Sequence, residues 1–342
     1  MKKLVWILFT LILVGCFAQI DDTDSVVTYS KKIVVEATLS ATEMWRIKKV
    51  DLPHSDISSG LLVSSDYVVI VSLDDSQQYI LNTISAGSGE ALWNVNVPSV
   101  DSMIMDGERI YVAVDWAIQA YEISTGNLVW HSEQLPQHTS YRFHPSVEEK
   151  VLVYSTEDYF SKREQVLRYY NVQDGTLETV RQEIPTDEWL VLRQPKIDFW
   201  AKKDGKVWAV SKPDSTILWE FYVDQQYNNT PLLTEAIIFL LDGPFPELNA
   251  VDVRSGALVW EYNEEIVSNI VTNQSVLYVL DINNTLIALD LHTGQEVGYI
   301  EFENSIKMTP ETDPYWIAVT DDNLFVYFGD SEELIAFKFT VP

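Results

Sequence analysis

A motif of eleven residues recurs along this chain at intervals of about forty residues. Its most complete copy is Ala250–Trp260, which reads Ala-Val-Asp-Val-Arg-Ser-Gly-Ala-Leu-Val-Trp. A period of this length indicates one supersecondary unit per repeat, in which no unit buries its apolar face alone and neighbours complete one another's core. The chain is therefore expected to fold as a repeat array. Further copies are Ala288–Gly294, Ala120–Trp130, Tyr169–Gly175 and Ser88–Trp93.

Each copy contains two runs of alternating apolar and polar residues, a pattern typical of strands covered on one face. Another β-rich run precedes the motif, as at Val276–Leu280, and Asn or Asp residues after it predict a tight turn. The Thr-Gly or Ser-Gly pair supplies the next turn. With one further strand, each repeat is a four-stranded antiparallel meander, and meanders of this kind assemble into a β-propeller.

Alignment on the motif's last residue counts the blades. It places Trp45, Trp93, Trp130, Thr179, Trp219, Trp260 and Gly298 at equivalent positions. The sequence therefore predicts an all-β, seven-bladed propeller, with eight blades as the alternative. A large aromatic ring repeated once per blade is expected to pack at the seam between neighbouring blades. The predicted blade-packing residues are Trp45, Trp93, Trp130, Trp219 and Trp260.

The two ends of the chain each hold part of a blade. Residues 315–319, 324–328 and 334–339 read as three strands, and 43–47 reads as a tryptophan strand with no blade before it. We expect the N-terminal strand to complete the C-terminal blade. That pairing would remove two exposed strand edges, which otherwise invite aggregation.

The first residues read as a secretory signal peptide, with Lys2 and Lys3 followed by an apolar run too short to span a membrane. Leu13–Cys16 resembles the bacterial lipobox, and Cys16 is the one cysteine of the chain. We therefore predict a lipoprotein signal peptide at 1–15, a lipidated Cys16 with its tether at 16–42, and the propeller at 43–342. The alternative is ordinary cleavage near Ala18. A single cysteine allows no intramolecular disulfide.

The chain is strongly acidic. Removal of Lys2 and Lys3 from 23 basic residues leaves 21 against 51 acidic ones, a net charge of −30, so nucleic acid is not an expected partner. The segment 142–212 is the exception, with 12 basic and 12 acidic residues. It also has a charged insertion at 157–164 and additional aromatic residues, and aromatic and arginine residues are enriched at interfaces. The candidate partner face consists of Tyr159, Phe160, Lys162, Arg163, Trp189, Trp200 and Trp208; the alternative is a drifted pair of blades.

The Ala-x-Asp-x-x-Thr-Gly-x-x-x-Trp pattern resembles the pyrroloquinoline-quinone-like propeller repeat family, over about 43–339. That family includes cofactor-using dehydrogenases and the BamB-like lipoproteins, which are scaffolds. The resemblance to the second branch implies a non-enzymatic scaffold of the cell envelope that binds protein partners during outer-membrane protein assembly. The alternatives are a quinone-dependent oxidoreductase and a binding module for a cationic or carbohydrate ligand.

Catalytic and metal-binding signals are weak. The acidic groups at Asp74–Asp75, Asp281–Asn283 and Asp321–Asn323 all fall at predicted turns, which explains their residue types. We therefore predict no enzyme activity, no cofactor and no metal. The expected molecule is a monomeric propeller attached to the membrane by its lipid alone, at the periplasmic face of an outer membrane or, in a host with one membrane, at the cell surface.

Overall fold

A computed structural model describes residues 40–48 and 60–340 apart from short internal gaps. Every regular element in these residues is a β-strand, and the described part has no helix long and apolar enough to cross a membrane. The signal peptide, Cys16 and most of the tether lie outside the described residues, so they remain predictions. The gaps are 75, 77, 115–116, 134–139, 144–149, 160–161, 184–187, 203, 224–230, 243–246, 274, 303–314 and 329–332.

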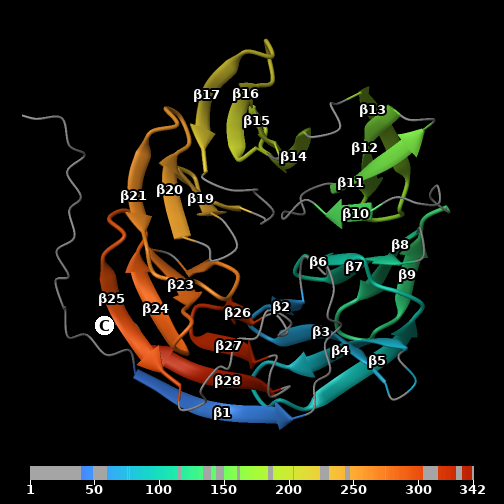
Figure 1. Cartoon of the computed structure of the whole chain (residues 1–342). Coiled ribbons are helices and arrows are strands. Elements are labelled where there is room, and N and C mark those ends of the chain that lie inside the picture. Colours follow the sequence, from blue (N-terminus) through green and yellow to red (C-terminus); the bar gives the residue numbers. More distant parts are fainter. Residues whose placement is uncertain are drawn as a thin grey trace, which may run out of the picture. The chain divides into compact units, whose positions relative to one another are not determined.

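The strands form seven four-stranded antiparallel sheets, which we call blades 1 to 7 (Figure 1). Blades 1 to 6 each use four consecutive strands. Blade 1 contains β2 (Leu61–Val63), β3 (Tyr67–Leu73), β4 (Tyr79–Ser85) and β5 (Ala91–Val97); blade 2 contains β6 (Ser102–Met105), β7 (Arg109–Val114), β8 (Ala117–Glu122) and β9 (Leu128–His131); blade 3 contains β10 (Ser140–Phe143), β11 (Lys150–Tyr159), β12 (Lys162–Asn171) and β13 (Leu177–Glu183).

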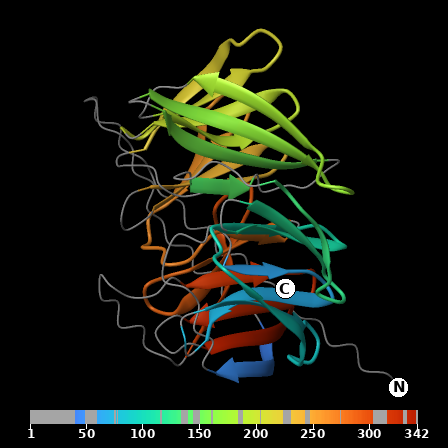
Figure 2. The ribbon, with the colours of Figure 1, turned by 90° about the vertical axis from the view of Figure 1, so that its right-hand side faces the viewer.

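Blade 4 contains β14 (Glu188–Arg193), β15 (Ile197–Lys202), β16 (Lys206–Ser211) and β17 (Ile217–Tyr222); blade 5 contains β18 (Leu232–Leu233), β19 (Ile237–Asp242), β20 (Glu247–Asp252) and β21 (Leu258–Tyr262); blade 6 contains β22 (Val271–Asn273), β23 (Val276–Leu280), β24 (Thr285–Asp290) and β25 (Glu296–Glu301). Strands β11 and β12 of blade 3, green in Figure 2, have ten residues each.

Blade 7 combines both ends of the propeller sequence. It contains β26 (Trp316–Val319), β27 (Asn323–Phe328) and β28 (Glu333–Thr340), and its fourth strand is β1 (Ser40–Lys48). Strand β1 runs antiparallel to β28, with Ser40 opposite Thr340 and Lys48 opposite Glu333 (Figure 1). The prediction that the N-terminal strand joins the C-terminal blade is confirmed, and the fold is a seven-bladed β-propeller.

The apolar core is divided among the seams between blades. Each seam has its own cluster of buried residues. In six clusters the members come from two successive blades, or from blades 7 and 1, and in the seventh Tyr169 of blade 3 packs on buried residues of blade 4. Strand β23 shows why these residues form strands, because Val276–Leu280 are all buried and supply both the seam to blade 5 and the seam to blade 7. A strand with both faces covered needs a continuous apolar run rather than an alternating one.

Five seams share one contact built by the repeated tryptophan. At the seam between blades 5 and 6, the indole N–H of Trp260 donates to the carbonyl of Leu291 (3.1 Å). The ring lies on Gly294, where an added Cβ would be 2.6 Å from it, and this glycine has a φ of +67°. Both constraints exclude larger residues. The other pairs are Trp45 with Gly89, Trp93 with Gly126, Trp130 with Gly175 and Trp219 with Gly256.

A β-bulge precedes the tryptophan position in six blades. In blade 5, Ala250 pairs with Trp260 and Val251 with Leu258, so Val259 is passed over. The extra residue changes the face on which the following side chain lies, which allows Trp260 to reach the next blade. The residues passed over are Met44, Leu92, Val129, Leu218, Val259 and Val297.

Two seams lack this tryptophan contact, for different reasons. Between blades 6 and 7, the outer strand of blade 6 has Gly298 at the tryptophan position. Blade 7 also has no turn that could receive an indole, because its last two strands, β28 and β1, come from opposite ends of the chain and are not joined by a turn. The side-chain amide of Asn269 bonds both the N–H (2.8 Å) and the carbonyl (2.9 Å) of Ile317 instead. Between blades 3 and 4, Ser215 occupies the glycine position with a φ of 57°.

The turns that carry these contacts are capped by acidic side chains. The Ser255 hydroxyl donates to the carboxylate of Asp252 (2.7 Å), as does the Ser255 N–H. These hydrogen bonds lower the pKa of Asp252, because they stabilise its charged form. The motif's aspartate is therefore explained by the turn between the last two strands of the blade.

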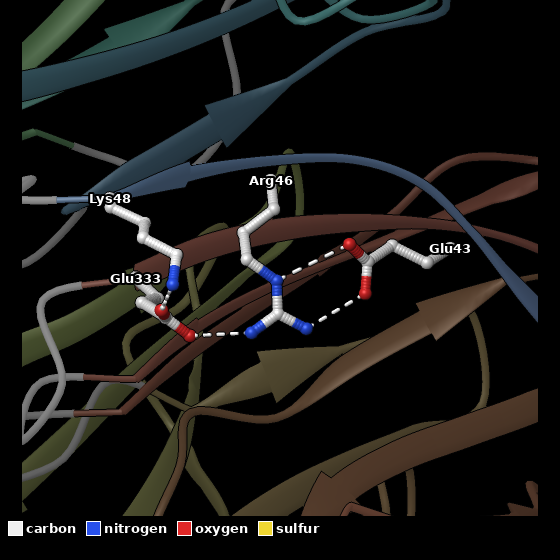
Figure 3. Close-up of polar contacts among 4 residues, drawn as sticks. All are labelled: Glu43, Arg46, Lys48 and Glu333. Atoms are coloured by element: carbon white, nitrogen blue, oxygen red, sulfur yellow. Dashed lines mark hydrogen bonds and ion pairs between the residues drawn. The ribbon is translucent and has the colours of Figure 1, made fainter.

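Charged residues reinforce the pairing of β1 with β28 (Figure 3). Glu333 is 8% exposed and accepts a hydrogen bond from Arg46 Nη1 at 2.7 Å, while Lys48 Nζ lies 3.3 Å from its second oxygen. Arg46 also bonds Glu43, and this hydrogen bond lowers the pKa of Glu43. Because four charges form one network around a buried carboxylate, it is worth more than an isolated surface pair.

Replacing Glu333 by glutamine is expected to lower the free energy of unfolding by about 1.5–3 kcal/mol, the contribution of hydrogen bonds to charged groups. Glutamine keeps the shape of the side chain but removes the charge that Arg46 and Lys48 share. Urea denaturation measures the loss. Glu43→Gln is the control, since its side chain is 43% exposed and an exposed pair contributes under about 1 kcal/mol. Equal losses in the two variants would contradict the prediction.

Candidate functional site

The charged insertion predicted at 157–164 is an extension of the hairpin formed by β11 and β12. These strands pair without interruption from Lys150 opposite Asn171 to Tyr159 opposite Lys162. Strand β10 pairs with β11 as far as Thr156, and β13 pairs with β12 as far as Glu164. The hairpin therefore continues as a two-stranded ribbon beyond the four-stranded part of blade 3.

Four residues of the candidate partner face are placed by their backbone alone. Tyr159 ends β11, Lys162 and Arg163 begin β12, and Trp189 lies in β14. Phe160 lies outside the described residues. The ribbon thus brings Tyr159, Lys162 and Arg163 together across two paired strands, whereas Trp189 belongs to the first strand of the next blade.

Trp200 and Trp208 are buried at the seam between blades 3 and 4. Their exposed fractions are 8% and 9%, they lie opposite each other on β15 and β16, and their rings stack at 6.4 Å and 16°. Together with Leu190 they form the cluster against which Tyr169 of blade 3 packs. The two indoles thus fill a seam that has no tryptophan on the outer strand of blade 3.

Charged side chains border this aromatic cluster. Lys206 Nζ lies 5.4 Å from the centre of a Trp208 ring and 2.6 Å from Glu220. The hydrogen bond to Glu220 raises the pKa of Lys206. On the same blade, Asp198 is 8% exposed and lies 4.0 Å from Lys212 Nζ. Positive and negative groups are thus paired within blade 4, in keeping with the balanced charge of this arc.

The blade 3 register differs from that of the other blades. Counting from the turn glycine places Thr179 at the tryptophan position, but Thr179 pairs with Arg168, and Glu178 is the residue opposite Tyr169. The strand has no bulge, so the residue that lies where the other blades have tryptophan is Glu178. Neither this register nor the role of Tyr169 and Leu190 in the seam was anticipated from the sequence. The one sign of this difference in the sequence was that the aligned position holds Thr179 rather than a tryptophan.

The acidic groups considered as metal ligands lie in turns. Asp281 accepts the N–H groups of Asn283 (2.9 Å) and Thr285 (2.7 Å) between β23 and β24. Asp74 accepts those of Ser76 and Gln78 between β3 and β4. Among the described residues, no group of three or more His, Cys, Asp or Glu side chains is placed to hold a metal ion.

Comparison with known proteins identifies the family. The family model described as "Outer membrane protein assembly factor BamB" matches residues 31–180, 196–297 and 245–339. The outer membrane protein assembly factor BamB of Yersinia pestis is 22% identical over 326 residues, covering 85% of this chain and 78% of that protein.

Two solved structures show the same fold. BamB from Moraxella catarrhalis superposes with a TM-score of 0.52 at 13% identity, covering 88% of this chain and 100% of that one. The computationally designed Ika8 protein superposes with a TM-score of 0.55 at 9% identity, covering 84% and 98%. Since a designed protein fits as well as a natural one, these superpositions establish the propeller fold and nothing further. The family model, which matches most of the sequence, shows that this chain belongs to the family of the outer membrane protein assembly factor BamB.

Proposed function

We propose that this protein is a non-enzymatic scaffold of the bacterial cell envelope that binds protein partners during the assembly of outer-membrane proteins. The observation that carries the proposal is the family match, which extends across the propeller from residue 31 to residue 339. The relative in Yersinia pestis bears the name of an assembly factor. We propose a monomer held at the periplasmic face of the outer membrane by lipid on Cys16, the only cysteine of the chain.

The partner face belongs, in this proposal, to the ribbon of β11 and β12. The ribbon extends beyond β10 and β13, and its sequence brings the cations Lys162 and Arg163 together in a chain with a net charge of −28. Lys162 and Arg163 offset Glu157 and Asp158 on the ribbon, so an acidic partner surface meets less repulsion here than over the strongly acidic remainder of the chain. The ribbon therefore offers both reach and a charge that differs from its surroundings.

Reversing the charges with Lys162→Glu and Arg163→Glu is expected to reduce capture of envelope partners several-fold, because it makes the ribbon as acidic as the rest of the chain. The measurement is quantitative crosslinking in intact envelopes followed by purification of the protein. Arg254→Glu is the control, since Arg254 is exposed on a turn of blade 5. Equal recovery of the same partners from both variants would place the partner face elsewhere.

The assembly role itself is tested in cells that lack the protein. We expect lower amounts of outer-membrane β-barrel proteins in the envelope fraction, and restoration by the wild-type chain but not by Cys16→Ala. Unchanged amounts of these proteins would contradict the role in assembly. Restoration by Cys16→Ala would contradict the lipid anchor but not the role in assembly.

A further inference from the structure

Exposed apolar side chains recur at the start of the outer strand in successive blades. The bulge leaves one residue outside the strand pairing directly before the tryptophan, and in blades 7, 1 and 2 this residue is Met44, Leu92 and Val129. All three are exposed, although the tryptophan that follows each of them is buried or half-buried. The bulge therefore turns a large apolar side chain toward solvent in each of these blades.

The tryptophan contacts bring these exposed side chains to the same seams. Trp93 of blade 1 rests on Gly126 of blade 2. Leu92 precedes this tryptophan and Leu128 follows this glycine by two residues, so both lie at the rim of one seam. The same contact joins blades 7 and 1, and blades 2 and 3. Neighbouring apolar side chains of this kind form a patch, whereas a single one is ordinary. We call these residues the rim arc: Met44, Leu92, Leu128, Val129 and Leu177.

The charge beside the rim arc has one sign. The turns before the outer strands of blades 1 to 3 carry Glu90, Glu122 and Asp174, all exposed, and no Lys, Arg or His. The hydroxyl of Thr176 donates to Asp174 (2.6 Å), and this hydrogen bond lowers the pKa of Asp174, which keeps it ionised at neutral pH. The equivalent turns of blades 4 to 6 differ, because each holds a basic residue or a histidine, namely Lys212, Arg254 and His292.

The direction of the rim arc decides which backbone conformation can lie on it. The arc passes from blade to blade, so it crosses the outer strands β1, β5, β9 and β13 instead of following one of them. A segment on the arc cannot form a ladder with strands that it crosses, and bulges interrupt three of them at this point. Its N–H and C=O groups must then be paired within the segment itself, as they are in an α-helix.

We propose that the rim arc docks a cationic amphipathic helix of a partner protein. The apolar face of the helix packs on the exposed side chains of the arc, as in other recognition of amphipathic helices. Its flanking Lys or Arg residues approach Glu90, Glu122 and Asp174, which supply the complementary charge. A second copy of this acidic chain, or an anionic lipid surface, carries the wrong charge for these turns.

The rim arc is separate from the ribbon proposed as the partner face. Strand β12 begins in the ribbon at Lys162 and ends at Asn171, which opens the turn beside the rim arc. The two surfaces therefore lie at opposite ends of this strand. The arc is a second docking surface, and helix binding to it does not depend on the assembly role.

The test uses a matched pair of sites in the full chain. Leu128 and Val129 are 49% and 43% exposed, and Leu258 and Val259 of blade 5 are 46% and 44% exposed; both pairs directly precede a tryptophan. The test variant changes Leu128 and Val129 to serine, and the control variant changes Leu258 and Val259 to serine. The probe is a fluorescein-labelled peptide of leucine and lysine with its leucines at i, i+3, i+4 and i+7. Fluorescence anisotropy measures its binding.

We expect the test variant to bind the peptide about tenfold more weakly than the wild type, a loss of about 1.4 kcal/mol, and the control variant to bind it unchanged. The helicity of the peptide, followed by circular dichroism, is expected to rise on binding. Glu90→Gln is expected to weaken binding as well, and added salt is expected to reduce that difference, because exposed charges are screened.

Equal affinity of the test and control variants would overturn the inference, since the lysines would then bind the acidic chain without preference for the arc. Binding without a gain in helicity would overturn it too. So would a wild-type dimer that dissociates in the test variant, or flotation with vesicles of phosphatidylethanolamine and phosphatidylglycerol that the test variant loses, because a second copy or a lipid surface would then occupy the arc.

Discussion

Deletion of Leu334–Phe339 is expected to abolish the cooperative unfolding transition and to produce aggregated protein. These residues form most of β28, which pairs with β27 on one side and with β1 on the other. Without β28, both neighbours become exposed edges, and unpaired edges promote association between chains. The deletion also detaches β1, whose Trp45 donates to the carbonyl of Ala86 in blade 1 (2.9 Å). Size-exclusion chromatography and thermal melting followed by circular dichroism measure the effect.

The control is a truncation after Thr340, which leaves β28 complete. It is expected to elute and melt like the full chain, so that any loss in the first variant is attributable to the strand. A deletion of Leu334–Phe339 that elutes as a monomer and unfolds in one sharp transition would contradict the view that blade 7 depends on its shared strand.

The place of the tryptophan at the seam between blades could be predicted because it recurs at one position of the repeat, whereas its contact with the turn glycine of the next blade is a finding of the structure. The turn glycine and the tryptophan lie four residues apart, as at Gly256 and Trp260, and each belongs to a different seam. Such local patterns predict structure well because the residue preferences of a turn and the size of an aromatic side chain depend on only a few neighbouring residues. Strand β1 could be assigned to blade 7 for the same reason, since Trp45 marks it as a last strand without a blade.

The register of blade 3 could not be predicted from that spacing. Gly175 and Thr179 are separated by the same four residues as Gly256 and Trp260, yet only the second strand has a bulge. The bulge does not require an indole, because blade 6 keeps it with Gly298 at the tryptophan position. The spacing between the turn glycine and the aligned residue is therefore compatible with either register, and β13 has the regular one.

The burial of the aromatic residues in blade 4 could not be predicted from the sequence either. Aromatic side chains are enriched both at interfaces and in packed interiors, so Trp200 and Trp208 carried no sign of which applied. Their placement depends on β15 and β16 pairing in the register that sets them opposite each other. The amide contacts of Asn269 also depend on the completed fold, because Ile317 is 48 residues away along the chain.

Replacing Trp260 by alanine is expected to lower the free energy of unfolding by about 3–5 kcal/mol, the range for truncation of a buried aromatic residue. The indole is 9% exposed, packs on Phe239 with ring centres 5.6 Å apart and rests on Gly294. Its loss also leaves the carbonyl of Leu291 without the indole donor. Urea denaturation measures the change, provided that the slope of the transition is the same in both proteins.

Leu258→Ala tests whether the loss comes from the seam rather than from the strand. Leu258 lies on the same strand but is 46% exposed, and exposed substitutions usually change stability by no more than about 0.5 kcal/mol. A loss at Trp260 as small as that of the control would mean that the seam is held by its aliphatic residues alone. In that case nothing physical would connect the missing tryptophan of blade 3 with the missing turn glycine of blade 4. A large decrease in the free energy of unfolding for Trp260→Ala would supply that connection. The tryptophan and the glycine stabilise the seam only as a pair, so a seam without one has no need of the other.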